Sequence, residues 1–281
     1  MTKQIGFVIL HYMTEDDTKN CVRSILENVS KAPIVVVDNG SENGTGEKLK
    51  NYYEDNKWVS VLCLERNQGF AKGNNEGIKF MRDRYNPGFI VVMNNDTLII
   101  QNDFRKIVEH EYNISNFAIL GPQIITKDGD KGSNPVEYIV DSRKKTSCLL
   151  LKRKIKLILC YLHLDFLMHN VGTSVKRYGV YDSERRYEDV KLHGACWIFS
   201  QKFFEQFEGL NPKTFLYFEE DILYLEMRKA RLKTVYNPEL IVIHLEDSST
   251  NSISETSRKK NIFVLKNEIQ SLKTVKKILE K

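Results

Sequence analysis

The chain has 281 residues, of which 41% are hydrophobic and 28% charged, with a formal net charge of +5. These values are typical of a globular protein and exclude collagen-like, disulfide-scaffold and wholly disordered chains. No run of 18 apolar residues is present, and the first ten residues lack the pattern of a secretory signal. Because the five cysteines are scattered and form no CxxC pair, we expect a reduced, cytoplasmic setting.

The charge is unevenly distributed along the chain. Residues 141–160 hold seven basic residues and one acidic residue, and residues 258–281 hold eight and two. The rest of the chain is net acidic. Two basic segments on an acidic body suit anionic partners such as lipid head groups or an acidic protein face.

Strand and helix patterns alternate in the first hundred residues. Apolar and β-branched runs predict strands at residues 4–10, 34–37, 58–64 and 89–93. Helices are predicted after an N-cap at Thr14, over residues 48–53 and over residues 70–82. This alternation indicates parallel βαβ units, which bind ligands beyond the carboxyl ends of their strands. The side chains at these ends are His11, Tyr12, Asp38, Asn39, residues 65–67 and residues 94–96.

The second half is less regular. Residues 120–195 show no clear periodicity, whereas residues 195–200 predict a strand and residues 221–230 a helix. Two short strands, 234–236 and 241–244, are expected on either side of a turn at Asn237 and Pro238. Apolar residues at spacings of three and four predict an amphipathic helix over residues 262–279.

Two acidic side chains follow predicted strands. Asp96, preceded by Asn94 and Asn95, offers hard oxygen ligands that suit Mg²⁺ or Mn²⁺ held also by phosphate and water. Asp38 is placed to accept a hydrogen bond from a pyrimidine base or a ribose hydroxyl. Ordinary Asx turns at the strand ends explain both patterns equally well.

A glycine-containing loop precedes the third predicted helix. Gly69 and Gly73 permit close approach of a ligand, and the helix N-terminus attracts phosphate. Arg66 and Lys72 add positive charge. The spacing is not GxGxxG, so a dinucleotide fingerprint is absent, and a solvated loop is the alternative.

Three acids, residues 219–221, directly follow the aromatic run 215–218. The dipole of the helix that begins there favours negative charge. The functional alternative is a carboxylate base beside an aromatic platform for a sugar. His244, which ends an apolar strand, is a candidate metal ligand or phosphate contact, and His193 has the same ambiguity.

Taken together, these motifs and their order closely resemble the family 2 glycosyltransferases, in particular the rhamnosyltransferase-like branch that builds bacterial surface polysaccharides. The resemblance covers about residues 4–249. It implies an α/β GT-A fold, with a nucleotide-binding half over about 1–120 and an acceptor half over about 121–249. A basic helical insert falls near 141–168, and residues 250–281 form a C-terminal amphipathic helical tail.

The resemblance also implies a chemistry. A sugar would pass with inversion from a UDP- or dTDP-linked donor to a hydroxyl of a glycan or lipid-linked acceptor, with Mg²⁺ or Mn²⁺ as cofactor. Asp96 matches the last acid of the family's DxD motif, although Asn94 replaces the first acid, and His244 matches a histidine near the metal. Asp38 matches the acid that contacts the base. The loop at Asn67 matches the nucleotide pocket, for which the candidates are Arg66, Asn67, Gly69, Lys72, Asn75 and Asn95.

The family's general base falls on Glu220, with Asp221 as the second choice. The uncertainty arises because Ile222 stands where the family usually has another Asp. A nucleotide-sugar-binding protein of the same fold without transferase activity is the alternative function.

The basic segments leave further alternatives open. The segment near residues 149–167 predicts either a helix docked on an anionic membrane, which would make the protein peripheral on its inner face, or a buried helix or homo-oligomer contact. No nucleic-acid-binding motif is present, so we expect no nucleic-acid partner.

Overall fold

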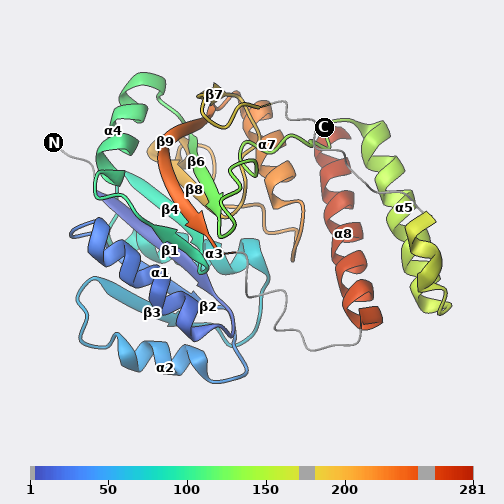
Figure 1. The fold of residues 1–281 in the computed structure, drawn as a ribbon, viewed down its shortest axis with the longest axis horizontal. Helices are drawn as coiled ribbons and strands as arrows, with labels where there is room; N and C mark the ends of the chain where they lie inside the picture. The colour runs from blue at the N-terminus through green and yellow to red at the C-terminus, as the bar shows by residue number, and fades with distance from the viewer. Residues whose placement is uncertain (1–3, 171–180, 246–256, 281) are drawn as a thin grey trace.

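The protein is built around one mixed β-sheet with helices on both faces, and a computed structural model describes residues 4–170, 181–245 and 257–280 (Figure 1). The strands are β1 (Ile5–His11), β2 (Ile34–Asp38), β3 (Val59–Cys63), β4 (Phe89–Asn94), β5 (Thr97–Ile99), β6 (Ile119–Thr126), β7 (Tyr187–Glu188), β8 (Cys196–Ser200) and β9 (Thr234–His244). The helices are α1 (Glu15–Asn28), α2 (Thr45–Tyr52), α3 (Phe70–Arg84), α4 (Phe104–Ser115), α5 (Arg143–Tyr161), α6 (Gln201–Phe204), α7 (Glu219–Ala230) and α8 (Ser257–Glu280), with a 3-10 helix at Asp165–Asn170.

The strand order of the sheet is β3-β2-β1-β4-β8-β6-β9-β5, and β7 pairs with β9. The first four strands of the chain run parallel, which confirms the βαβ prediction, whereas β8 is antiparallel to both β4 and β6. In register, His11 lies opposite Asp38, and Leu10 lies opposite Asn94. The carboxyl ends of β1, β2 and β4 therefore meet at one edge.

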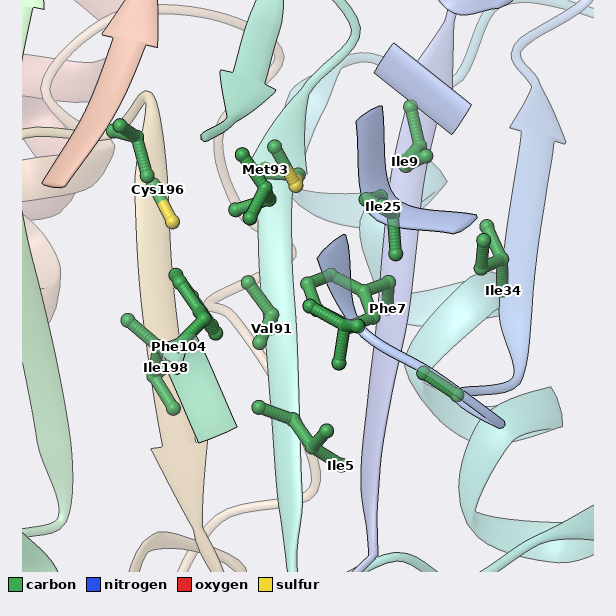
Figure 2. Close-up of a cluster of buried hydrophobic side chains, with 14 of the residues drawn as sticks. Ile5, Phe7, Ile9, Ile25, Ile34, Val91, Met93, Phe104, Cys196 and Ile198 are labelled. Atoms are coloured by element: carbon green, nitrogen blue, oxygen red, sulfur yellow. The ribbon is translucent and has the colours of Figure 1, made fainter. Parts of the chain in front are cut away.

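Alternating side chains of the strands fill two cores. Figure 2 shows Ile5, Phe7 and Ile9 of β1 beside Val91 and Met93 of β4, all on the face that α1 and α4 cover. The intervening residues of β1 and β4 belong to the opposite core, with α3 and α7. Because successive strand residues point to opposite faces, a sheet buried on both sides needs continuous apolar runs, as these strands have.

One predicted turn is wrong. The two short strands expected around Asn237 and Pro238 form the single strand β9, which pairs with β6 on both sides of an irregularity. The local signal is real, because Asn237 accepts a hydrogen bond from the Glu239 N–H. It produces a bulge rather than a chain reversal, since the pairing with β6 resumes at Ile241.

The two basic helices, α5 and α8, lie side by side at one end of the molecule, beyond α7 (Figure 1). The expected amphipathic helix is confirmed, because Leu272 and Val275 are buried against Ile222 and Leu225 of α7. The proposed domain boundary at residues 249 and 250 lies outside the described residues. Within the described ranges, no helix is both long and apolar enough to cross a membrane.

Candidate active site

The carboxyl ends of β1, β2 and β4 open into a cavity of about 530 Å³. Residues from three other segments complete its wall: the loop before α3, the aromatic run before α7, and one turn of α8. The lining residues are Leu10, Tyr12, Asn39, Asn67, Gly69, Phe70, Asn94, Asn95, Asp96, Phe215, Leu216, Tyr217 and Phe263. The cavity is therefore at the edge where the strand-end rule places a ligand.

Two asparagines shape the loop before α3. Asn39 donates a hydrogen bond to Oδ1 of Asn67 at 3.0 Å and accepts one from the Gln68 N–H. Asn67 in turn accepts from the Gly69 N–H. The Phe70 N–H, at the start of α3, donates to the carbonyl of Phe215. The expectation that this helix end attracts phosphate stays a prediction.

Gly69 is required at its position for two physical reasons. Its φ is +85°, and a Cβ there would lie 2.4 Å from the Phe215 carbonyl oxygen. Gly69→Ala is expected to lower the free energy of unfolding by about 1–3 kcal/mol and to weaken ligand binding in the cavity. Gly129→Ala is the matched control, since Gly129 has φ +83° with no atom within 4 Å of its added Cβ. Chemical denaturation measures both, and equal losses would contradict a role for the Phe215 contact.

Not all of the loop candidates reach the cavity. Arg66 and Lys72 are exposed, and neither is among the residues that line it. Asn75 pairs with the backbone of Leu210 through both side-chain polar atoms, at 2.7 and 2.8 Å, and lines a different hollow. The structure thus brings Asn67, Gly69 and Asn95 to the cavity and leaves Arg66, Lys72 and Asn75 outside it.

Asp38 ends β2 beside the cavity rather than in its wall. It lines an adjacent hollow of about 240 Å³, where it accepts a hydrogen bond from the Ser41 N–H at 3.2 Å. The Nε2 atom of His11 lies 3.9 Å from Oδ1 of Asp38. Burial of the imidazole ring lowers the pKa of His11. A Cβ on Gly46 would overlap Asp38, so a side chain at residue 46 would close this hollow.

Asp96 and His244 approach each other from two different parts of the sheet. The His244 Nε2 atom lies 3.2 Å from Oδ1 of Asp96. That oxygen is buried and accepts no hydrogen bond from the described residues. A buried carboxylate oxygen beside an imidazole nitrogen suits a divalent cation. Within residues 4–170, 181–245 and 257–280, no group of three or more His, Cys, Asp or Glu side chains is placed so that it could hold a metal ion.

The residues before Asp96 are held by α1. Asn95 donates hydrogen bonds to the hydroxyls of Thr14 at 2.7 Å and Thr18 at 3.0 Å. Thr14 is the N-cap residue of α1, as predicted, but its side chain makes no capping hydrogen bond. The expected cap is replaced by the contact with Asn95, which fixes the turn that carries Asp96.

Glu220, in the first turn of α7, lies near His193, whose ring is in turn close to that of His244. Its Oε1 atom accepts a hydrogen bond from the Gly194 N–H at 2.6 Å and lies 4.0 Å from His193 Nδ1. The ring of His193 is 5.9 Å from that of His244. Glu220, His193, His244 and Asp96 thus form a continuous line of side chains. Glu220 keeps 27% exposure, so its carboxylate is accessible to a ligand.

Asp221 has a different environment. One carboxylate oxygen pairs with Lys191 at 2.7 Å, and the other accepts a hydrogen bond from the Val140 N–H at 2.8 Å. Burial raises the pKa of Asp221, and Lys191 opposes that rise. The two oxygens therefore connect α7 to the segment before α5 and to the segment between β7 and β8, and Asp221 is not among the residues that line the cavity.

Glu219 is the first acid of the run, and burial raises its pKa from 4.5 to about 7. The native state then binds more protons than the unfolded state, so stability falls as pH rises from about 4.5 to 7. Glu219→Gln is expected to remove this loss and to raise the free energy of unfolding by about 3 kcal/mol near pH 8. Near pH 4 the two proteins should match. Urea unfolding at both pH values tests this, and a pH-independent difference would count against it.

The aromatic segment before α7 has a strained backbone and is held in place by contacts with α8. Tyr217 and Phe218 have φ values of 73° and 64°, a left-handed conformation that is costly for aromatic residues. The Ser271 hydroxyl of α8 donates to the carbonyl of Leu216 at 3.0 Å, and Phe263 packs edge-on against Phe215. Strain of this kind concentrates at functional sites. Phe263 is a lining residue that no sequence signal identified, because it lies within an ordinary amphipathic helix.

Comparison with known proteins gives a consistent result. The family model described as glycosyl transferase family 2 matches residues 7–207. The low-salt glycan biosynthesis hexosyltransferase Agl10 of Haloferax volcanii is 26% identical over 220 residues, 78% of this chain and 60% of that protein. The dTDP-rhamnosyl transferase RfbF of Shigella flexneri is 31% identical over 128 residues, 46% of this chain and 41% of that protein. The chain thus spans 60% or less of the length of these two relatives.

Solved structures confirm the expected fold. The structure of GalNAc-T7 with UDP, GalNAc and Mn²⁺ has a TM-score of 0.59 and 13% identity, covering 94% of this chain and 48% of that one. The mannosyltransferase PcManGT from Pyrobaculum calidifontis, in complex with GDP-Man and Mn²⁺, has a TM-score of 0.56 and 11% identity, covering 100% and 75%. Both are GT-A glycosyltransferases, and at these identities the likeness concerns the fold. From the family match over most of its length, the chain belongs to glycosyl transferase family 2.

Proposed function

We propose that this protein is an inverting glycosyltransferase that moves a sugar from a UDP- or dTDP-linked donor to a hydroxyl of a glycan or lipid-linked acceptor. The observation that carries the proposal is the line of side chains from Asp96, which lines the cavity, through His244 and His193 to Glu220. It supplies a cation-binding pair at one end and an accessible carboxylate at the other.

Asp96 and His244 would hold a divalent cation, Mg²⁺ or Mn²⁺. The buried oxygen of Asp96, which accepts no hydrogen bond from the described residues, supports this assignment, as do the Mn²⁺ ions named with both solved structures. When bound, such an ion would neutralise the negative charge that develops on a leaving diphosphate. The chain's own contribution is to hold Asp96 in place, through the hydrogen bonds of Asn95 to α1.

The donor nucleotide would occupy the cavity and the hollow beside it. Asp38, at the end of β2, is proposed to accept a hydrogen bond from the base, and the loop of Asn67 and Gly69 to line the sugar–phosphate portion. The name of the rhamnosyl transferase relative supports a dTDP-linked donor, and UDP remains the second choice. Phe215 and Tyr217 would form an apolar wall for the sugar.

Glu220 is proposed as the general base. It would take the proton of the acceptor hydroxyl while the oxygen attacks the anomeric carbon, and the electron pair of the breaking bond would leave on the diphosphate. The Gly194 N–H orients this carboxylate. The paired and buried state of Asp221 supports assigning that residue to structure rather than to proton transfer.

The proposal is tested by incubating the purified chain with UDP-, dTDP- and GDP-sugars and Mn²⁺. We expect donor hydrolysis or transfer with one uridine or thymidine donor, together with a rise in melting temperature. Thermal stabilisation without any turnover across the panel and an acceptor library would instead identify a nucleotide-sugar-binding protein of the same fold.

A further inference from the structure

Helix α5 has two apolar faces, of which one packs against other described residues and the other is exposed among them. Leu149 and Leu150 pack against the cluster that α7 and α8 share. On the outer side, large apolar residues at spacings of three and four are 40–69% exposed. They are Leu151, Ile155, Ile158, Tyr161 and Leu162, and Phe166 follows them. The sequence pattern, apolar nearly all round, therefore separates into a buried face and an exposed stripe.

Lysines border this stripe on both helices. Lys154 is exposed within α5, between Leu151 and Ile158. On α8, exposed lysines recur at spacings of seven and four, at Lys259, Lys266, Lys273 and Lys277. The ammonium group of Lys266 lies 5.7 Å from the centre of the Tyr161 ring, so the row of lysines on α8 adjoins the apolar stripe on α5. We call the exposed apolar stripe and these lysines the α5–α8 surface.

Acidic side chains near these two helices pair with arginines: Asp165 lies 2.7 Å from Arg258 of α8. Glu268, in the middle of α8, pairs with Arg153 of α5 at 2.6 Å, so its charge is used between the helices. Burial lowers the pKa of Lys156, and the neighbouring charge of Arg153 lowers it further. Two segments far apart in sequence, each net positive, thus combine into one positive region.

This combination of features indicates the kind of partner. A contiguous exposed apolar stripe of this size marks an interaction surface. Lysines beside it match the anionic head groups of a bilayer, whose acyl boundary accepts the apolar side chains. A second copy docked on the same surface would bring like charges together, which disfavours a symmetric dimer there.

We propose that the α5–α8 surface docks this protein on an anionic lipid bilayer. The inference does not depend on the proposed reaction, because it rests on exposure and charge outside the cavity. Its position is nonetheless relevant to the site. Phe263, three residues before Lys266 on α8, lines the cavity, so docking would hold the cavity near the membrane surface.

The test is sedimentation of the full chain with vesicles of phosphatidylcholine alone or mixed with phosphatidylglycerol. We expect binding only to the mixed vesicles and its loss in high salt. Ile158→Glu should reduce binding at least tenfold, and Lys154→Gln about fivefold. Ile114→Glu is the matched control, since Ile114 is 63% exposed but lies on α4, and it should bind as the unchanged chain does.

Melting temperatures of all three variants show whether they are folded. Failure of the unchanged chain to sediment with mixed vesicles would overturn the proposal, as would equal binding to uncharged vesicles. A dimer that Ile158→Glu dissociates, without vesicle binding, would assign the surface to self-association instead. Equal loss of binding in Ile158→Glu and Ile114→Glu would also refute it.

Discussion

Replacing Glu220 with glutamine is expected to reduce kcat by about 10²–10⁴-fold while the protein stays folded and binds the donor nucleotide. The amide keeps the size of the side chain and can still accept the hydrogen bond from Gly194, but it cannot take a proton from the acceptor. The measurement is steady-state transfer with the donor found by the panel, accompanied by a melting curve and a nucleotide titration.

Its neighbours in the acid run are natural controls. Glu219→Gln should leave kcat within a few-fold, because Glu219 lines a separate small hollow with Thr214 and Leu223, and neither histidine lines that hollow. Asp221→Asn should lower the melting temperature, since Lys191 would lose the partner that neutralises its charge in a buried position. If Glu220→Gln kept near-full turnover and Asp221→Asn abolished it in folded protein, the base assignment would move to Asp221.

The choice between these acids shows what the sequence alone can settle. Three consecutive residues on a helix point in directions about 100° apart, so a motif shifted by one residue selects a different environment. In the sequence, the dipole of the helix that begins here favours a negative charge at each of the three positions equally. Only the tertiary contacts separate them: the Gly194 N–H donates to Glu220, and the Lys191 ammonium lies 2.7 Å from Asp221 but 4.0 Å from Glu220.

Elements that local pattern determines were predicted well. The strands β1, β2 and β4 are short apolar runs bounded by polar turns, and their carboxyl ends lie at the cavity as the parallel-sheet rule requires. Asp96 and His244 were predicted as a pair by family resemblance, and the structure brings them within 3.2 Å. The pairing of β5 with β9 explains the proximity, since Thr97 lies opposite His244.

Features that depend on distant contacts were not predictable. The region from 120 to 195 looked irregular, yet it contains β6, a central strand whose glycine and proline weaken the strand pattern. The role of Gly69 as a contact for the Phe215 carbonyl was hidden for the same reason. A glycine in a loop suggests an approaching ligand, and here the approaching group is the protein's own backbone.

Replacing Asp96 with alanine is expected to remove metal-dependent turnover, with a loss of at least 10³-fold. The buried oxygen facing His244 would disappear, and with it the carboxylate proposed to hold the cation. Titration of Mn²⁺ in the presence of UDP or dTDP gives an independent readout, since the variant should lose the nucleotide-dependent Mn²⁺ site. Asp128→Asn is the control, because Asp128 is exposed and outside the cavity.

His244→Ala separates the two ligands of the proposed site. It should weaken Mn²⁺ binding about 10–100-fold without eliminating it, because Asp96 and the diphosphate would remain. Full activity of Asp96→Ala in a metal-free buffer would show that the reaction needs no cation. Side chains would then have to supply the positive charge that neutralises the leaving diphosphate. In that case the contact of Asp96 with His244 at 3.2 Å would have a purely structural role.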